Sequence, residues 1–408
     1  LAAPSVWVAL ELARTYALSG LPWSLLGYSQ YRWLPAIQIA DVTGVYGVSF
    51  VIVLANVALT ELGLWATDYL RGWKTVPVPW LPVTAAALVL AVTLGYGFFR
   101  LWALEAPGNR GVRGMHRSVR IGLVQANIDQ GHKWDPAYTR ETLDRYSRLT
   151  ERASHESDLV IWPEAATPFI FEHEQGYRRE VTSLVRAGGA PLLLGSPAVG
   201  YEPDGRPYLL NSAYLLTSEG QTIGRYDKQH LVPFGEYVPL RSLLFFLDKL
   251  VVGIGDFKPG EQATILQLPR PPHLAPVKFG VVICYEVIFP DLVRQFSARG
   301  AELMVTITND AWFGRSVAPF QHFGMVVFRS VENRVAFARA ANTGVSGFID
   351  PLGRILAETP IYEEAAVLGA IPVGRLPTFY TRFGDVFANA CVIMIGILCA
   401  VAYRRRKA

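Results

Sequence analysis

The sequence predicts an α/β domain inserted between membrane-spanning helices. Residues 117–375 alternate short β-branched runs with amphipathic stretches of helical period, which is the pattern of an α/β domain. Outside that region, the stretches 42–62, 76–99 and 384–403 are apolar and about long enough to cross a bilayer. The mean hydropathy of +0.25 is high for a wholly soluble chain. We therefore expect one globular domain attached to a membrane region.

The membrane region is predicted over residues 1–103. Residues 1–18 read as a partial apolar helix in which Glu11 and Arg14 lie one turn apart, so that both charges face protein rather than lipid. Residues 19–41 are rich in Trp, Tyr and Pro, a composition typical of a bilayer interface. The first two spans follow this segment.

The distribution of basic residues predicts the orientation in the membrane. Arg71 and Lys74 lie between the first two spans, and the basic tail 404–408 follows the last one. Because cytoplasmic loops are enriched in Lys and Arg, we expect that loop and that tail in the cytoplasm. The region 117–375 is then expected on the outer face.

Within the region 117–375 we expect about 260 residues of one domain, which is a common domain size. Strands are predicted at 119–126, 158–162, 191–195, 211–217, 277–283 and 302–307, and helices at 138–153, 173–187, 287–299 and 318–334.

Composition argues against several classes of partner. The formal charge is only +4, and basic residues cluster only in the C-terminal tail, so nucleic acid is not expected as a partner. The three cysteines are too few for a disulfide framework, and the seven histidines lack the spacing of metal ligands. We expect no metal and no cofactor.

A cysteine directly after a buried strand is the first candidate for chemistry. Cys284 follows the apolar run 277–283, at a turn after which a helix is expected to begin near Val287. The N–H groups at a helix start stabilise negative charge and would lower the pKa of the thiol. The alternative is a small buried hydrophobe, as most free cysteines are.

Two other strand ends carry charged residues that suit the same chemistry. Glu164 follows the strand at 158–162, and Lys228 and Glu236 lie in one later stretch. A thiol that attacks a carbonyl needs a base, and the oxyanion that forms needs donors such as an ammonium and a backbone N–H. For each residue taken singly the structural alternative is favoured: Glu164 as a helix-start carboxylate, Lys228 as a solvated surface charge and Glu236 as a turn residue.

Together these motifs resemble the nitrilase superfamily and, within it, the membrane-bound apolipoprotein N-acyltransferases. The resemblance rests on WPE (162–164), DKQHLVPFGE (227–236), CYE (284–286), TNDAWFG (308–314) and RSVENR (329–334), with PWSLLGYSQ (22–30) and KWDP (133–136) outside them. It covers nearly the whole chain. Since that family carries additional spans at its start and this chain begins at Leu1 within a predicted helix, we expect an N-terminal truncation.

The resemblance implies a fold and roles for individual residues. The fold is a four-layer α-β-β-α sandwich. Glu164 is implied as general base, Lys228 as stabiliser of the tetrahedral intermediate and Cys284 as nucleophile. The supporting residues implied are Glu236 beside the triad and Tyr285 and Glu286 on the wall of the site, whereas His230 is left as a solvated or structural residue. Trp134 and Trp312 are either core residues or contacts for the substrate.

One further stretch, Leu243–Val252, is too apolar for a solvated loop. It is either a buried helix or a lid that touches lipid and admits an acyl chain.

The implied function is acyl transfer at the bacterial inner membrane. An acyl chain would pass from a phospholipid to Cys284 as a thioester, and then to the N-terminal amine of the diacylglyceryl-cysteine of an apolipoprotein. The alternatives are a membrane-tethered amidase that uses water as acceptor and a catalytically inactive scaffold. Spans on both sides of the domain favour acyl transfer, because a water-soluble amide needs neither.

Overall fold

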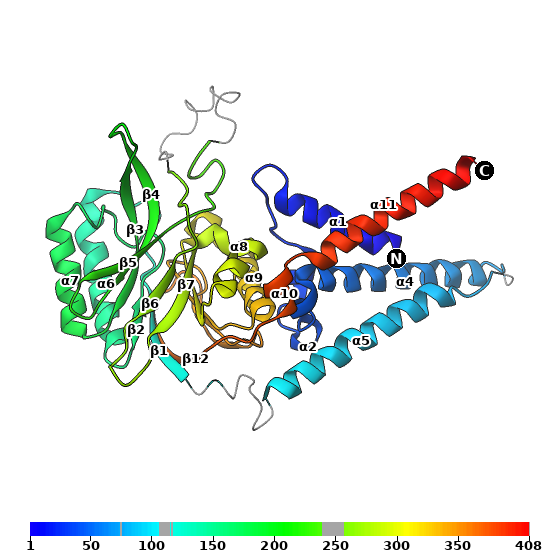
Figure 1. Ribbon diagram of the computed structural model, residues 1–408, viewed down its shortest axis with the longest axis horizontal. Helices are drawn as coiled ribbons and strands as arrows, with labels where there is room; N and C mark the ends of the chain where they lie inside the picture. Colours follow the sequence, from blue (N-terminus) through cyan, green and yellow to red (C-terminus); the bar gives the residue numbers. More distant parts are fainter. Residues whose placement is uncertain (74–75, 106–114, 116, 239–256, 408) are drawn as a thin grey trace.

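A computed structural model describes residues 1–73, 76–105, 115, 117–238 and 257–407. Two sheets flanked by helices form the left part of Figure 1, and the long helices α4, α5 and α11 extend to the right. Lys74 and the apolar stretch Leu243–Val252 lie outside the described residues.

The first sheet has the strand order β12-β1-β2-β3-β4-β5. Its strands are β1 (Arg117–Gln125), β2 (Leu159–Ile161), β3 (Leu192–Tyr201), β4 (Pro207–Leu216), β5 (Thr222–Asp227) and β12 (Ala365–Val373). The central strands β1, β2 and β3 are parallel, with Leu123 opposite Ile161 and Ile161 opposite Leu193. The C-terminal ends of parallel strands lie at the same edge of a sheet, so the residues that follow β2 leave the sheet at the edge where β1 and β3 also end.

The second sheet has the order β11-β10-β9-β8-β7-β6. Its strands are β6 (Ile265–Leu268), β7 (Val277–Ile283), β8 (Leu303–Thr308), β9 (Phe337–Ala341), β10 (Gly347–Ile349) and β11 (Ile355–Glu358). Strands β7, β8 and β9 are parallel, and Ile283 lies opposite Ile307. The segments after β7 and β8 therefore also leave one edge together.

Helices cover the outer face of each sheet, which confirms the predicted four-layer sandwich. Helices α6 (Thr139–Ser154) and α7 (Gln175–Gly188) cover the first sheet, and α8 (Pro290–Ala298) and α9 (Ala318–Asn333) cover the second. Successive side chains of a strand point to opposite faces. In β2, Leu159 and Ile161 accordingly join the core between the sheets, whereas Val160 packs in the core under α6 and α7.

Six strands, β5, β6 and β9–β12, were not predicted. The edge strands β6 and β11 have four residues each and the inner strand β10 has three, so all are too short to show a period. In β9 the fully buried Arg339 also interrupts the apolar pattern. The helix expected near Val287 was predicted too early, because the 3₁₀ helix η5 (Cys284–Ile288) precedes α8.

Three helices in the described part of the chain are long and apolar enough to cross a membrane. They are α4 (Val45–Leu70), α5 (Trp80–Glu105) and α11 (Val386–Lys407). The first two run beyond the predicted ends at 62 and 99. Helix α1 (Ala2–Tyr16) packs against α4 and α11. Short helices η1 (Leu26–Gln30), α2 (Leu34–Ile37) and α3 (Ala40–Thr43) connect α1 to α4, and α10 (Phe379–Phe383) precedes α11.

The RSVENR motif at the end of α9 binds the N-terminal region to the sandwich. Arg334 donates to Asp41 Oδ2 at 2.8 Å and to Gln38 Oε1 at 2.6 Å. Glu332 Oε1 accepts from the backbone N–H of Val45 at 3.0 Å. Since these groups are buried and would be costly to leave unpaired, they fix the position of α3 and α4 against α9.

Candidate active site

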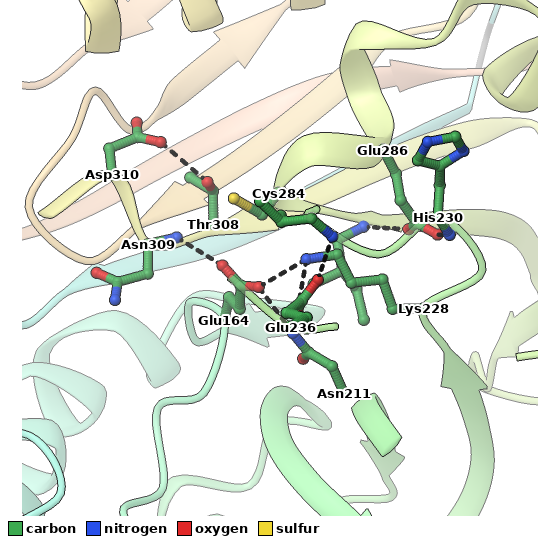
Figure 2. Close-up of polar contacts among 12 residues, drawn as sticks. Glu164, Asn211, Lys228, His230, Glu236, Cys284, Glu286, Thr308, Asn309 and Asp310 are labelled. Carbon is green, nitrogen blue, oxygen red and sulfur yellow. Dashed lines mark hydrogen bonds and ion pairs between the residues drawn. The ribbon is translucent and has the colours of Figure 1, made fainter. Parts of the chain in front are cut away.

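The two sheets bring together the three residues predicted to carry chemistry. Glu164 follows β2 and Lys228 follows β5 in the first sheet, whereas Cys284 directly follows β7 in the second. Figure 2 shows the three side chains converging between the sheet edges. The two sheets face each other, so each contributes part of one polar cluster inside an otherwise apolar sandwich.

Glu164 is held by three donors. Oε1 accepts from Asn211 Nδ2 at 2.8 Å and from Lys228 Nζ at 3.3 Å, and Oε2 accepts from the backbone N–H of Asn309 at 2.9 Å. Burial acts to raise the pKa of Glu164, but nearby positive charge, first that of Lys228, and the Asn211 hydrogen bond hold this pKa below its ordinary value. The carboxyl group is therefore ionised and ready to accept a proton.

A glycine makes the position of Glu164 possible. A Cβ at Gly195 of β3 would lie 2.5 Å from the carbonyl oxygen of Pro163 and 2.8 Å from Cα of Glu164. No side chain fits at such separations, so Gly195 allows the Glu164 loop to lie directly on β3.

Lys228 lies between two carboxylates and is only 1% exposed. Its Nζ donates to Glu236 Oε1 at 2.9 Å as well as to Glu164, and Asn211 Nδ2 also reaches Glu236 Oε1 at 2.8 Å. Burial acts to lower the pKa of Lys228, but Glu236 and Glu164 outweigh it and raise this pKa above its usual value. Lys228 is thus a permanently charged buried group, and the alternative of a solvated surface charge is wrong.

Cys284 has a backbone φ of +53°, in the left-handed region that L-residues rarely adopt. Such a conformation costs on the order of 1–3 kcal/mol and persists only where the surroundings enforce it. The residue is half-buried. Burial, followed by the charge of Glu164, raises the pKa of the thiol, whereas Lys228 acts to lower it. The expected lowering of the thiol pKa was wrong, because no long helix starts at this turn and a carboxylate lies beside the sulfur.

Glu286 supports two loops and does not form a wall of the site. It is fully buried, at 0% exposure, which leaves no surface for a substrate to touch. Oε1 accepts from the backbone N–H of Gln229 at 2.6 Å, and Oε2 accepts from that of Ile283 at 2.6 Å. Burial raises the pKa of Glu286 to about 7. Its carboxyl group ties the loop after Lys228 to the strand before Cys284.

Tyr285 and His230 point toward the N-terminal segment. The Tyr285 hydroxyl donates to the carbonyl oxygen of Gly20 at 2.9 Å, and His230 Nε2 lies 2.9 Å from that of Ser19. The His230 ring stacks on Phe289, with 3.7 Å between ring centroids. Of the two roles predicted for His230, the structural one is found.

The two tryptophans predicted as core residues or substrate contacts are both exposed. Trp134 is 50% exposed and Trp312 is 75% exposed. Each adjoins a residue or loop that contacts Glu164: Trp134 follows Lys133, and Trp312 lies three residues after Asn309. The core alternative is therefore wrong for both.

Sequence reasoning missed Lys133 and Asn211. Lys133 is buried, and its Nζ lies 3.2 Å from the carbonyl oxygen of Glu164. Burial lowers the pKa of Lys133 to about 8, although Glu164 and Cys284 act to raise it. Lys133 belongs to the KWDP motif (133–136), and this motif could have identified it as a residue of the site. Asn211 lies within β4, where the sequence shows only a polar residue in a strand.

Comparison with known proteins decides the family. The profile of the carbon-nitrogen hydrolase family matches residues 120–378, and that of the apolipoprotein N-acyltransferase N-terminal domain matches residues 1–58. The apolipoprotein N-acyltransferase of Geobacter metallireducens is 46% identical over 99% of this chain and 74% of its own length. The chain belongs to the apolipoprotein N-acyltransferase family.

A second relative supports the same assignment. The apolipoprotein N-acyltransferase of Chlorobaculum tepidum is 34% identical over 100% of this chain and 77% of its own length. A solved amidase from Nesterenkonia sp. has a TM-score of 0.46 and 24% identity, over 65% of this chain and 92% of the amidase. The predicted N-acyltransferase of the nitrilase superfamily is confirmed. The amidase alternative fits less well, because residues 1–58 match a domain specific to the apolipoprotein N-acyltransferase family.

Proposed function

We propose that this apolipoprotein N-acyltransferase works through a Glu164–Lys228–Cys284 triad, with a phospholipid as acyl donor. The observation that carries the proposal is the convergence of Glu164, Lys228 and Cys284 in one cluster, where Asn211, Lys228 and the backbone of Asn309 hold the carboxylate of Glu164. An ionised carboxylate near a protonated thiol supports general-base catalysis, in which the proton moves as sulfur attacks.

In the first half-reaction, Cys284 Sγ attacks the ester carbonyl of the donor while Glu164 accepts the thiol proton. Collapse of the tetrahedral intermediate breaks the ester C–O bond, and Glu164 returns the proton to the leaving alcohol. The products are an acyl thioester on Cys284 and a lysophospholipid.

In the second half-reaction, the α-amino group of the diacylglyceryl-cysteine of an apolipoprotein attacks the thioester. Glu164 accepts the amine proton, the C–S bond breaks, and the thiolate regains a proton. Release of the amide product regenerates the free enzyme.

Lys228 stabilises the oxyanion in both steps. An ammonium has three N–H groups, and two of them bind Glu164 and Glu236 in the described structure. The third can donate to the oxyanion. Glu164 and Glu236, which both accept from Asn211, hold the ammonium in place before the substrate arrives, so no reorganisation is needed during the reaction.

Helices α4, α5 and α11, which are long and apolar enough to cross a membrane, support a reaction at a membrane surface. The basic last turn of α11 and Arg71 after α4 support an orientation in which the sandwich lies away from the cytoplasm, on the outer face of the bacterial inner membrane. The exposed Trp134 and Trp312 adjoin the contacts of Glu164, where they can meet substrate acyl chains.

The proposal is tested by measuring the intact mass of the protein after incubation with phospholipid alone. An adduct of one acyl chain on Cys284 that persists until an amine acceptor is added is expected. An adduct that water removes rapidly would indicate an amidase, and no adduct at all would contradict the thioester mechanism.

Replacing Lys133 is expected to shift the pH dependence of adduct formation. The charge of Lys133 lowers the pKa of Glu164, so Lys133→Met raises this pKa and moves the acid limb of the rate profile to higher pH. The difference from wild type is confined to acidic pH and fades once Glu164 is ionised in both proteins. Lys133→Arg keeps the charge and should keep the limb in place. An unmoved limb in Lys133→Met would contradict this role.

A further inference from the structure

A buried imidazole lies against the backbone of the proposed nucleophile. His322 of α9 has no exposed surface, and its Nε2 lies 3.2 Å from the carbonyl oxygen of Cys284. Its Nδ1 lies 2.9 Å from Asp310 Oδ1, and Arg339 Nη2 donates to Asp310 Oδ2 at 2.8 Å. The mechanism above does not use these three residues.

A hydrogen bond from His322 to the Cys284 carbonyl requires a hydrogen on Nε2, which the protonated ring and one of the two neutral tautomers carry. A carbonyl oxygen can only accept, so the bond to Cys284 requires Nε2–H. When the ring is protonated, Nδ1–H donates to Asp310; when it is neutral, Nδ1 can accept from Arg339 Nη2, which lies 3.1 Å away. Nε2–H therefore points at Cys284 in both cases.

The surroundings of Asp310 are built to hold this arrangement. Thr308 Oγ1 donates to Asp310 Oδ1 at 3.0 Å, and Figure 2 shows the Thr308 side chain between those of Asp310 and Cys284. A Cβ at Gly344 would lie only 2.0 Å from Asp310 Oδ2, so no larger residue fits there. Trp23 of the N-terminal segment covers the His322 ring, with 5.2 Å between ring centroids.

We propose that His322, held by Asp310 and Arg339, is a positioning residue that fixes the carbonyl of Cys284 and thereby aims the thiol. Cys284 has a left-handed φ of +53°, which its surroundings must enforce. The hydrogen bond from His322 does so from behind the nucleophile. The direction of Sγ follows from the backbone, so an unbound carbonyl would let the sulfur leave the line of attack. This inference rests on the proposed role of Cys284.

Two substitutions separate this contact from the fit of the side chain. In His322→Gln, the amide nitrogen can take the place of Nε2 and donate to Cys284. In His322→Asn, the shorter amide can still meet Asp310 but does not reach the Cys284 carbonyl. Both variants are neutral, polar and smaller than histidine.

The measurement is the single-turnover rate constant for acylation of Cys284, which does not depend on the fraction of protein that is folded. His322→Asn is expected to lose about 10²-fold, the cost of misplacing a reacting group by about 1 Å, at an unchanged donor concentration for half-saturation. His322→Gln is expected to recover most of that loss. Melting temperatures of both variants are measured in the same detergent.

The outcomes distinguish the possible failures. Equal rates in the two variants, whether high or low, would overturn the positioning role, because only the reach to Cys284 differs. If wild-type Cys284 is never acylated, the proposed function fails instead. If neither His322 variant folds, Asp310→Asn decides: it removes the charge that holds the ring, and a wild-type rate in it would refute the proposal.

Discussion

Replacing Cys284 with serine is expected to abolish acyl transfer, lowering kcat by on the order of 10⁶-fold, the loss seen when a nucleophile is removed from a catalytic unit. A hydroxyl has a far higher pKa than a thiol and is a much weaker nucleophile. Even the thiol pKa is raised here by burial and by Glu164, so the base already works against an unfavourable proton transfer. Glu164, whose own pKa is low, cannot activate a hydroxyl.

The fold of this variant should remain intact, since serine is nearly isosteric and Cys284 contributes its carbonyl, not its sulfur, to the bond with His322. Cys284→Ala is the matched control, because alanine has neither a thiol nor a hydroxyl and therefore gives the background rate. The check is acyl transfer to an apolipoprotein peptide, together with the melting temperature. Wild-type-like transfer by the serine variant would refute the thioester intermediate.

Replacing Lys228 with arginine is expected to be nearly as damaging as replacing it with alanine. Losing one oxyanion donor costs about 10²–10³ in rate. A planar guanidinium cannot reproduce a compact ammonium that meets Glu164, Glu236 and an oxyanion from one point. Lys228 is almost fully buried, so a longer side chain has no room to reorient.

The two variants should differ in stability. Lys228→Ala leaves the buried Glu164 and the partly buried Glu236 without their cation, and breaking a buried pair costs about 3–5 kcal/mol. Lys228→Arg keeps the charge and should lose less. Rates of acylation and thermal unfolding are measured for both. The control is Lys258→Arg at the surface pair with Glu202, where no change is expected. An arginine variant at position 228 with most of its activity would remove Lys228 from the mechanism.

Much of the fold could be predicted because its signals are local. The alternation of Leu159, Val160 and Ile161 between two cores is written in consecutive residues, and so are the apolar runs of α4, α5 and α11. The edge strands β6 and β11 have only four residues each, and their pairing comes from longer neighbours. Such strands cannot be found from period alone.

The sequence by itself determined the fold class, the family and the positions of Glu164, Lys228 and Cys284 at strand ends, because strand periodicity and motif order are carried by neighbouring residues. Only the tertiary structure decided how these groups behave. The raised thiol pKa at Cys284, the double carboxylate pairing of Lys228, the buried supporting place of Glu286 and the contact of His322 with Cys284 all depend on distances between separate segments. The strength of electrostatic interactions and hydrogen bonds depends on those distances, and the face-to-face packing of the two sheets determines the distances.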